Sequence, residues 1–156
     1  MTNYEDPDKY NRCIEDIGEL LRQTVRTCQV LERQQIRTHG FTSSQCYILL
    51  EILKAESMTI NEISLKMGLE ISTITRIMDN LVRDGLVVRT RSPRDKRIVE
   101  ALLTEAGRRE AIKLRNSIHS YYQNIISLLP AGHVREVMSA TQQLLTAVVQ
   151  AGNKDA

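Results

Sequence analysis

The fold is decided by residues 59–103, which read TINEISLKMGLEISTITRIMDNLVRDGLVVRTRSPRDKRIVEALL. The segment opens with Thr59-Ile-Asn-Glu62, the spacing of a capping box, in which two side chains satisfy unpaired backbone amides at a helix start. Gly68 ends this short helix, and a further helix is expected over residues 71–84. Another capping box, Thr42-Ser-Ser-Gln45, begins the helix that precedes them. Two short helices joined by a glycine-containing turn predict a helix-turn-helix.

A β-hairpin is expected directly after the second of these helices. Residues 86–91 are rich in β-branched side chains, residues 92–97 have the composition of a turn, and residues 98–103 can form a returning strand. A strand, a basic turn and a second strand make a hairpin wing. The predicted fold class is mainly α with a small β-hairpin wing, a winged helix-turn-helix over residues 42–103.

Long helices are expected on both sides of this segment. Apolar residues recur at helical spacing over residues 8–38, 104–129 and 133–151. These apolar stripes are longer than a small winged helix can cover, and soluble monomers rarely expose large apolar patches. We therefore expect residues 8–38 and 104–151 to be dimerisation helices, and residues 1–156 to form a single domain that assembles as a homodimer.

Basic residues are concentrated in one part of the chain. Residues 83–97 hold six basic and two acidic side chains, whereas the net charge of the whole chain is only +2 at pH 7. A basic patch fits a polyanion such as double-stranded DNA, because each Lys or Arg beside a phosphate releases counterions. No apolar run approaches the roughly 20 residues of a membrane span. With a polar, acidic N-terminus, this predicts a cytoplasmic protein that does not associate with membranes.

The helix expected at residues 71–84 has two separable faces. Ile74, Ile77, Met78 and Leu81 lie on an apolar stripe and are expected in the core. The opposite side carries small hydroxyl groups, an amide and arginines, which can read base edges in the major groove. The candidate DNA-binding residues of this helix are Ser72, Thr73, Arg76, Asn80 and Arg83, with Thr75 at the edge of the face. An ordinary exposed face would favour better helix formers than Ser and Thr.

The turn of the expected wing supplies three more candidate DNA-binding residues, Arg94, Lys96 and Arg97. Arginine suits a narrow minor groove, where the negative potential is enhanced, and either cation can contact phosphates. Asp95 is an acid inside this basic turn and lies two residues before Arg97. We interpret Asp95 as a structural residue that holds the turn and aims Arg97.

These motifs resemble the MarR family of bacterial regulators. The resemblance is carried by Asp95-Lys-Arg97, Leu103-Thr104 and Gly107, which match the pattern D-x-R-x5-L-T-x2-G, and by Ile71-Ser-Thr-Ile-Thr-Arg76 with Leu81 and Gly85-Leu-Val87. It implies a homodimer with intertwined terminal helices and one winged helix-turn-helix per subunit on a pseudo-palindromic operator. It also implies release from DNA by a small phenolic or lipophilic ligand, or by an oxidant.

The signal that such a regulator senses could act at several residues. Cys46 and Tyr47 are candidate lining residues of an effector pocket for a small aromatic or lipophilic molecule, framed by the first, second and fifth helices. In the family's hydroperoxide-sensing branch the reactive cysteine aligns near Gly18, and Cys13 lies about five residues too early, a departure that counts against that branch. Cys13 is the candidate redox residue, because a sensing thiol must be reachable and ionisable. A structural role is the alternative for Cys13, Cys28 and Cys46.

No catalytic site, cofactor or metal site is expected. The three histidines are scattered, and no phosphate-binding loop, nucleophile elbow or HExxH motif occurs. The expected function is a sequence-specific DNA-binding transcriptional repressor, released by a small molecule or an oxidant. The alternative is a winged-helix protein-interaction module without DNA binding, which would lose the wing arginines or carry acids on the recognition face. We expect neither change in this chain. A thiol peroxidase would need a catalytic constellation around a cysteine.

Overall fold

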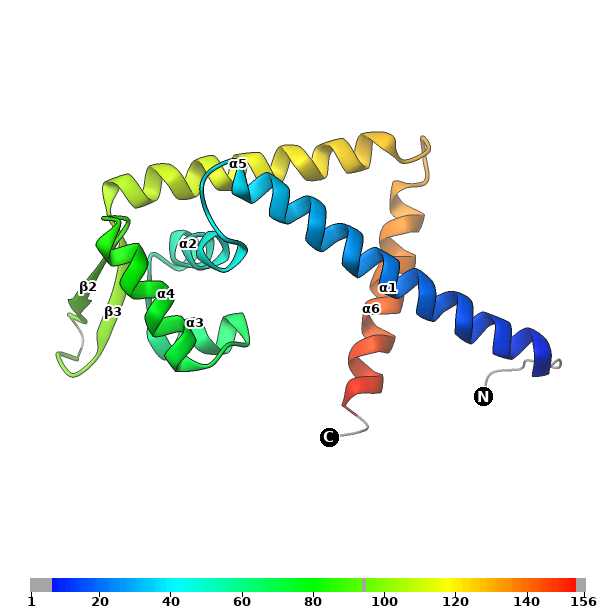
Figure 1. Cartoon of the computed structure of the whole chain (residues 1–156), viewed down its shortest axis with the longest axis horizontal. Coiled ribbons are helices and arrows are strands. Elements are labelled where there is room, and N and C mark those ends of the chain that lie inside the picture. The colour runs from blue at the N-terminus through cyan, green and yellow to red at the C-terminus, as the bar shows by residue number, and fades with distance from the viewer. Residues whose placement is uncertain (1–6, 94, 154–156) are drawn as a thin grey trace. The chain divides into compact units, whose positions relative to one another are not determined.

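The computed structural model describes residues 7–93 and 95–153, so the predicted DNA contact Arg94 lies outside the described residues. The helices are α1 (Pro7–Arg37), α2 (Ser43–Ala55), α3 (Ile60–Met67), α4 (Ile71–Arg83), α5 (Glu105–Leu128) and α6 (Val134–Gly152). The strands are β1 (Ser57–Thr59), β2 (Val87–Arg91) and β3 (Val99–Leu103). This order confirms the predicted fold class, a mainly helical winged helix-turn-helix (Figure 1).

The chain divides into two compact units, and the boundary lies inside α5. The first unit ends at Ile118 and contains α1 to α4, the sheet and the first part of α5. The second unit begins at His119 and contains the rest of α5 and all of α6. The helix-turn-helix, the wing and their common core therefore belong to the first unit.

Both predicted capping boxes are present and fix the starts of α2 and α3. The Thr42 amide donates to Oε1 of Gln45 at 3.0 Å, and the Gln45 amide donates to the Thr42 hydroxyl at 3.3 Å. At α3, the Thr59 amide donates to Oε2 of Glu62 at 2.7 Å, and the Glu62 amide donates to the Thr59 hydroxyl at 3.2 Å. The hydrogen bonds from the Thr59 amide and then from its hydroxyl lower the pKa of Glu62. Gly68 ends α3 in the left-handed conformation, with φ 62°.

The wing is part of a three-stranded antiparallel sheet in the order β1-β3-β2. The predicted hairpin is confirmed, with β2 and β3 paired from Val87 opposite Leu103 to Arg91 opposite Val99. Strand β1 was not predicted, because three residues are too few to show the alternation of a strand. It pairs with the other edge of β3, so that Met58 lies opposite Ala101.

The core of the first unit lies between the helices and one face of this sheet. The prediction that the apolar stripe of α4 faces the core is confirmed, since Ile74, Met78 and Leu81 are fully buried and Ile77 is half-buried against them. They pack with buried residues of the other elements, which are Ile36, Cys46, Ile48, Leu49, Ile52, Met58, Ile63, Val87, Ala101, Ala111, Leu114 and Ile118. Each large aliphatic side chain buried in this way contributes about 1.5–3 kcal/mol. The core therefore holds α4 with its opposite face outward.

Candidate nucleic-acid interface

The outward face of α4 carries six of the predicted DNA contacts. The exposed ones are Ser72, Arg76 and Arg83, and the half-buried ones are Thr73, Thr75 and Asn80. Helix α4 packs against α3 on one side and against β2 on another, so its polar face and the wing belong to one packed body (Figure 1). A helix held in this way presents a short row of polar groups beside a basic hairpin.

Two of these side chains already make contacts within the protein. The Thr75 hydroxyl donates to the Ile71 carbonyl at 2.8 Å, so its oxygen remains an acceptor and its methyl group a contact for thymine. Nε of Arg83 lies 3.4 Å from Oδ1 of Asp84, and both side chains are exposed. Exposed pairs of this kind are weak, typically below about 1 kcal/mol, so Arg83 can exchange Asp84 for a phosphate.

An acidic residue also lies on the outward face of α4, and the expectation that this face carries no acid was wrong. Asp79 comes three residues after Arg76 and four before Arg83, which places the three side chains side by side. Nη2 of Arg89, on β2, lies 2.8 Å from Oδ1 of Asp79. Neither Asp79 nor Arg89 was among the predicted site residues, although helical spacing alone places Asp79 on this face.

The turn of the wing is ordered by Asp95. Its carboxylate accepts a hydrogen bond from the Arg97 amide at 2.9 Å, and its carbonyl accepts one from the Ile98 amide at 2.9 Å. The carboxylate thus contacts the backbone of Arg97, and this contact fixes the position of the Arg97 backbone in the turn. Lys96 and Arg97 are both exposed.

Arg97 also borders a shallow hollow between the wing and the start of α3. The hollow is lined by Thr59, Ile60, Asn61, Glu62, Arg97, Ile98 and Val99. The arginine therefore adds its charge where α3, the sheet and the wing meet, on the same unit as α4.

The candidate signal-sensing residues occupy different environments. Cys46 is fully buried, and burial, with a contribution from the negative charge of Glu32, raises the pKa of its thiol to about 11. Such a thiol stays protonated at neutral pH and packs as a small apolar group. Tyr47 is half-buried, and its hydroxyl donates to the carboxylate of Glu32, which ties α2 to α1. Cys13 and Cys28 are exposed on α1.

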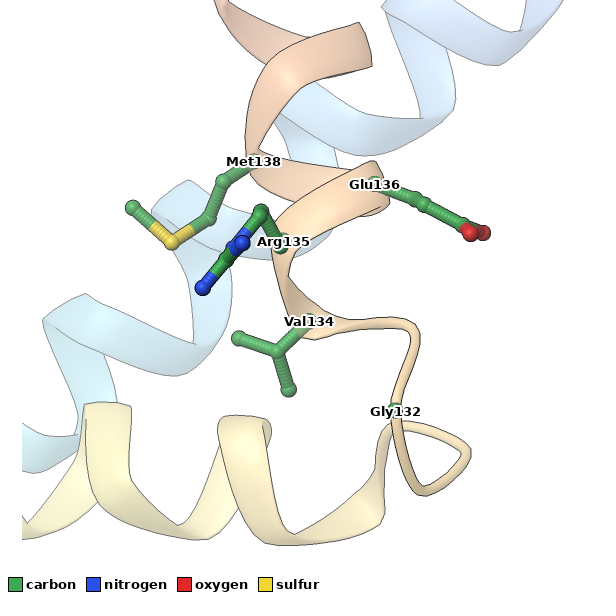
Figure 2. A pocket seen from close by; sticks show the side chains of 5 residues that line it. All are labelled: Gly132, Val134, Arg135, Glu136 and Met138. Carbon is green, nitrogen blue, oxygen red and sulfur yellow. The ribbon is translucent and has the colours of Figure 1, made fainter.

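In the second unit, the start of α6 borders a further hollow, lined by Gly132, Val134, Arg135, Glu136 and Met138. Figure 2 shows that the Glu136 side chain points away from those of Arg135 and Met138. These groups do not converge on one point, and none of them belongs to a predicted site. Over residues 7–93 and 95–153, no three His, Cys, Asp or Glu side chains are placed to hold a metal ion.

A helix-turn-helix followed by a sheet with a basic hairpin defines the chain as a winged helix-turn-helix protein. The family model of the MarR family matches residues 41–99, from the start of α2 into β3. The chain belongs to the MarR family, a family of transcriptional regulators.

Similar proteins support this assignment over most of the chain. The HTH-type transcriptional repressor MdtR of Bacillus subtilis is 25% identical over 130 residues, covering 80% of this chain and 84% of the relative. A MarR family protein from Bacillus stearothermophilus superposes with a TM-score of 0.75 at 24% identity, covering 89% of this chain and 97% of that one. A mutant MarR from Escherichia coli complexed with operator DNA matches with a TM-score of 0.69 at 24% identity, covering 85% and 95%.

No helix within the described ranges combines the length and the apolar character needed to cross a membrane.

Proposed function

We propose that this regulator is a homodimeric repressor that binds a pseudo-palindromic operator through α4 and the wing. A small aromatic or lipophilic molecule, or an oxidant, releases it from DNA. Residues 42–103 form the DNA-binding part of one MarR-type domain, residues 8–38 and 104–151 form its dimerisation helices, and the protein acts in the cytoplasm.

One observation carries the proposal. Helix α4 buries Ile74, Met78 and Leu81 completely while Ser72 and Arg76 remain exposed. A helix that is fixed by its core side and offers hydroxyl and guanidinium groups outward has the chemistry of a recognition helix in the major groove. The operator complex of the related Escherichia coli MarR supports this use of the fold.

The wing supplies the contacts that do not depend on sequence. Lys96 and Arg97 are exposed next to a turn that Asp95 orders, and Arg94 completes the basic group in the sequence. Cations at this position release counterions from phosphates and hold the protein on the duplex, while α4 reads the bases.

Dimerisation is supported by apolar side chains that the chain leaves exposed. On α1 these are Tyr10, Ile14, Ile17, Leu20, Val25, Val30 and Leu31. On the second unit they are Tyr122, Ile125, Ile126, Leu128, Val137, Met138, Leu145, Val148 and Val149, and α6 has no buried residue. A second copy covers such stripes and places two recognition helices on two half-sites about one helical turn apart.

Signal sensing is proposed at the contact between α1 and α2. The hydrogen bond from Tyr47 to Glu32 joins these helices beside the buried Cys46. A bound aromatic molecule that takes over this hydrogen bond would change how α2 packs on α1. Cys13, exposed on α1, is the thiol through which an oxidant would act.

Selection of binding sites from a pool of random DNA duplexes tests the proposed function. The expected result is one enriched sequence with two inverted half-sites, bound by a dimer and released by an aromatic acid or a peroxide. A reporter gene placed behind that sequence should be less active when the protein is present. Failure to enrich any sequence from the pool would favour the protein-interaction module instead.

A further inference from the structure

Asp79 and Arg89 join the two elements proposed to contact DNA. Asp79 lies on the outward face of α4, and Arg89 lies on β2 at the base of the wing. Nη2 of Arg89 and Oδ1 of Asp79 are 2.8 Å apart, and the side chains are 34% and 57% exposed, respectively. The arginine side chain is therefore the more covered of the two, whereas the carboxylate stands on the surface that would face a duplex.

The sheet explains why Arg89 meets α4. Arg89 lies opposite Ala101 on β3, and directly opposed residues of antiparallel strands point to the same face. Ala101 is buried and small, so this face of β2 is the one turned toward the core and α4. The Arg89 side chain extends from there to the edge of the core, where its guanidinium pairs with the Asp79 carboxylate.

This ion pair removes one positive charge from those available to DNA. A guanidinium held by a carboxylate displaces no counterion from a phosphate, and the carboxylate itself repels the duplex. Sequence-independent binding comes almost entirely from phosphate contacts. The pair therefore weakens the kind of binding that a regulator must limit on bulk DNA.

We propose that Asp79 is a specificity-determining residue that withholds Arg89 from DNA phosphates and so lowers the affinity for DNA of arbitrary sequence. This inference rests on the proposed function. A protein bound to DNA without base contacts can shift along the DNA backbone until Arg89, no longer paired with a carboxylate, contacts a phosphate. At an operator, base contacts hold the protein in one register, so a released arginine gains less there.

The test compares the full-length wild type with Asp79→Asn on a random-sequence duplex and on the selected operator over a series of salt concentrations. Affinity of Asp79→Asn for the random duplex should rise on the order of tenfold at low salt, and the slope of log K against log salt should steepen by about 0.9. The gain at the operator should be smaller, so the ratio of specific to random affinity should fall. Asp79→Ser, which removes the carboxylate with a different side chain, should give the same change in slope.

Glu19→Gln is the matched control. It removes the same charge and also breaks a 2.8 Å pair with an arginine, Arg22, but on α1. Its affinity and slope should equal those of the wild type. If it binds as tightly as Asp79→Asn, overall charge explains the gain and the proposal is overturned.

The double variant Asp79→Asn/Arg89→Gln identifies the source of the gain. If Arg89 supplies the new phosphate contact, the double variant should lose the steeper slope. A gain that survives without Arg89, or unchanged affinity and slope in both Asp79 variants, overturns the proposal. A wild type that binds neither duplex overturns the proposed function instead, so the two failures are distinguishable.

Discussion

Gly107 lies so close to Leu86 that a Cβ added to the glycine would stand 1.9 Å from the Leu86 carbonyl oxygen. The same carbonyl accepts a hydrogen bond from the Thr104 amide at 3.0 Å. The Thr104 hydroxyl donates to the Gly85 carbonyl at 2.7 Å and accepts from the Gly107 amide at 2.9 Å. The residues of the L-T-x2-G pattern thus hold the start of α5 against the segment that follows α4, through hydrogen bonds and close backbone packing.

Gly107→Ala should destabilise the protein, because the new methyl group meets backbone atoms that cannot rotate away. Overpacking of a filled site costs about 1–3 kcal/mol, and chemical denaturation of the variant measures the loss. Gly152→Ala is the control, since among the described residues no atom beyond its chain neighbours and its own helix backbone lies within 4 Å of its added Cβ. Equal loss of stability in both variants would contradict the close approach at Gly107.

Much of the fold could be predicted because its signals are local. Thr42 and Thr59 each mark a helix start through a partner only three residues away, and both capping boxes occur as predicted. The apolar spacing of Ile74, Met78 and Leu81 likewise identified the buried side of α4. Strand β1 was missed because its evidence is a pairing with β3, far along the chain, rather than a pattern of its own.

The candidate site was less predictable, because its contacts depend on tertiary packing. Asp79 could have been placed on the outward face from its spacing to Arg76, but its ion pair with Arg89 requires the distance between α4 and β2. Asp95 was expected to hold the turn and aim Arg97. Its carboxylate binds the Arg97 amide, which a tight turn brings nearer than the guanidinium at the end of a long side chain.

Arg76 and Lys96 should contribute differently to DNA binding. Arg76→Ala should relax the sequence preference and cost about 1–3 kcal/mol at the operator, because a bidentate contact to a guanine is lost. Lys96→Ala should weaken binding to all sequences and reduce the salt slope by about 0.9, because a phosphate contact is lost. Fluorescence anisotropy with operator and random duplexes separates the two effects. Arg22→Ala, on α1, is the control and should bind as the wild type does. If Arg76→Ala and Lys96→Ala bind both duplexes just as this control does, α4 is not the helix that reads the bases.

The buried thiol of Cys46 should make stability fall at alkaline pH. Its pKa is about 11 in the folded chain against 9.0 for an ordinary thiol. Between these values the unfolded chain loses the proton while the folded chain keeps it, so stability is full below pH 9 and declines toward pH 11. A difference of two pKa units corresponds to about 3 kcal/mol.

Denaturant unfolding of the wild type and Cys46→Ala at pH 8 and pH 11 isolates this contribution, since other groups titrate equally in both proteins. The wild type should lose about 2 kcal/mol more than the variant over this range, because at pH 11 the folded thiol is itself half ionised. Alkylation provides an independent check, because Cys13 and Cys28 are exposed and should react before Cys46. A parallel decline in both proteins would show that the Cys46 thiol ionises without penalty.

Dimerisation through the long helices can be tested on exposed leucines of different elements. Leu145 on α6 is 55% exposed, and a second copy is proposed to cover it, whereas Leu65 on α3 is 87% exposed outside those helices. Leu145→Asp removes burial of about 1.5–3 kcal/mol from each subunit. The dissociation constant of the dimer should therefore rise on the order of a hundredfold or more. Leu65→Asp should leave the association constant unchanged, because its side chain stays in water in both states.

Sedimentation equilibrium at micromolar concentration measures the association constants of both variants. A wild-type chain that sediments as a stable monomer would show that the apolar stripes of α1, α5 and α6 do not serve a second copy, and operator binding would then have to come from one recognition helix.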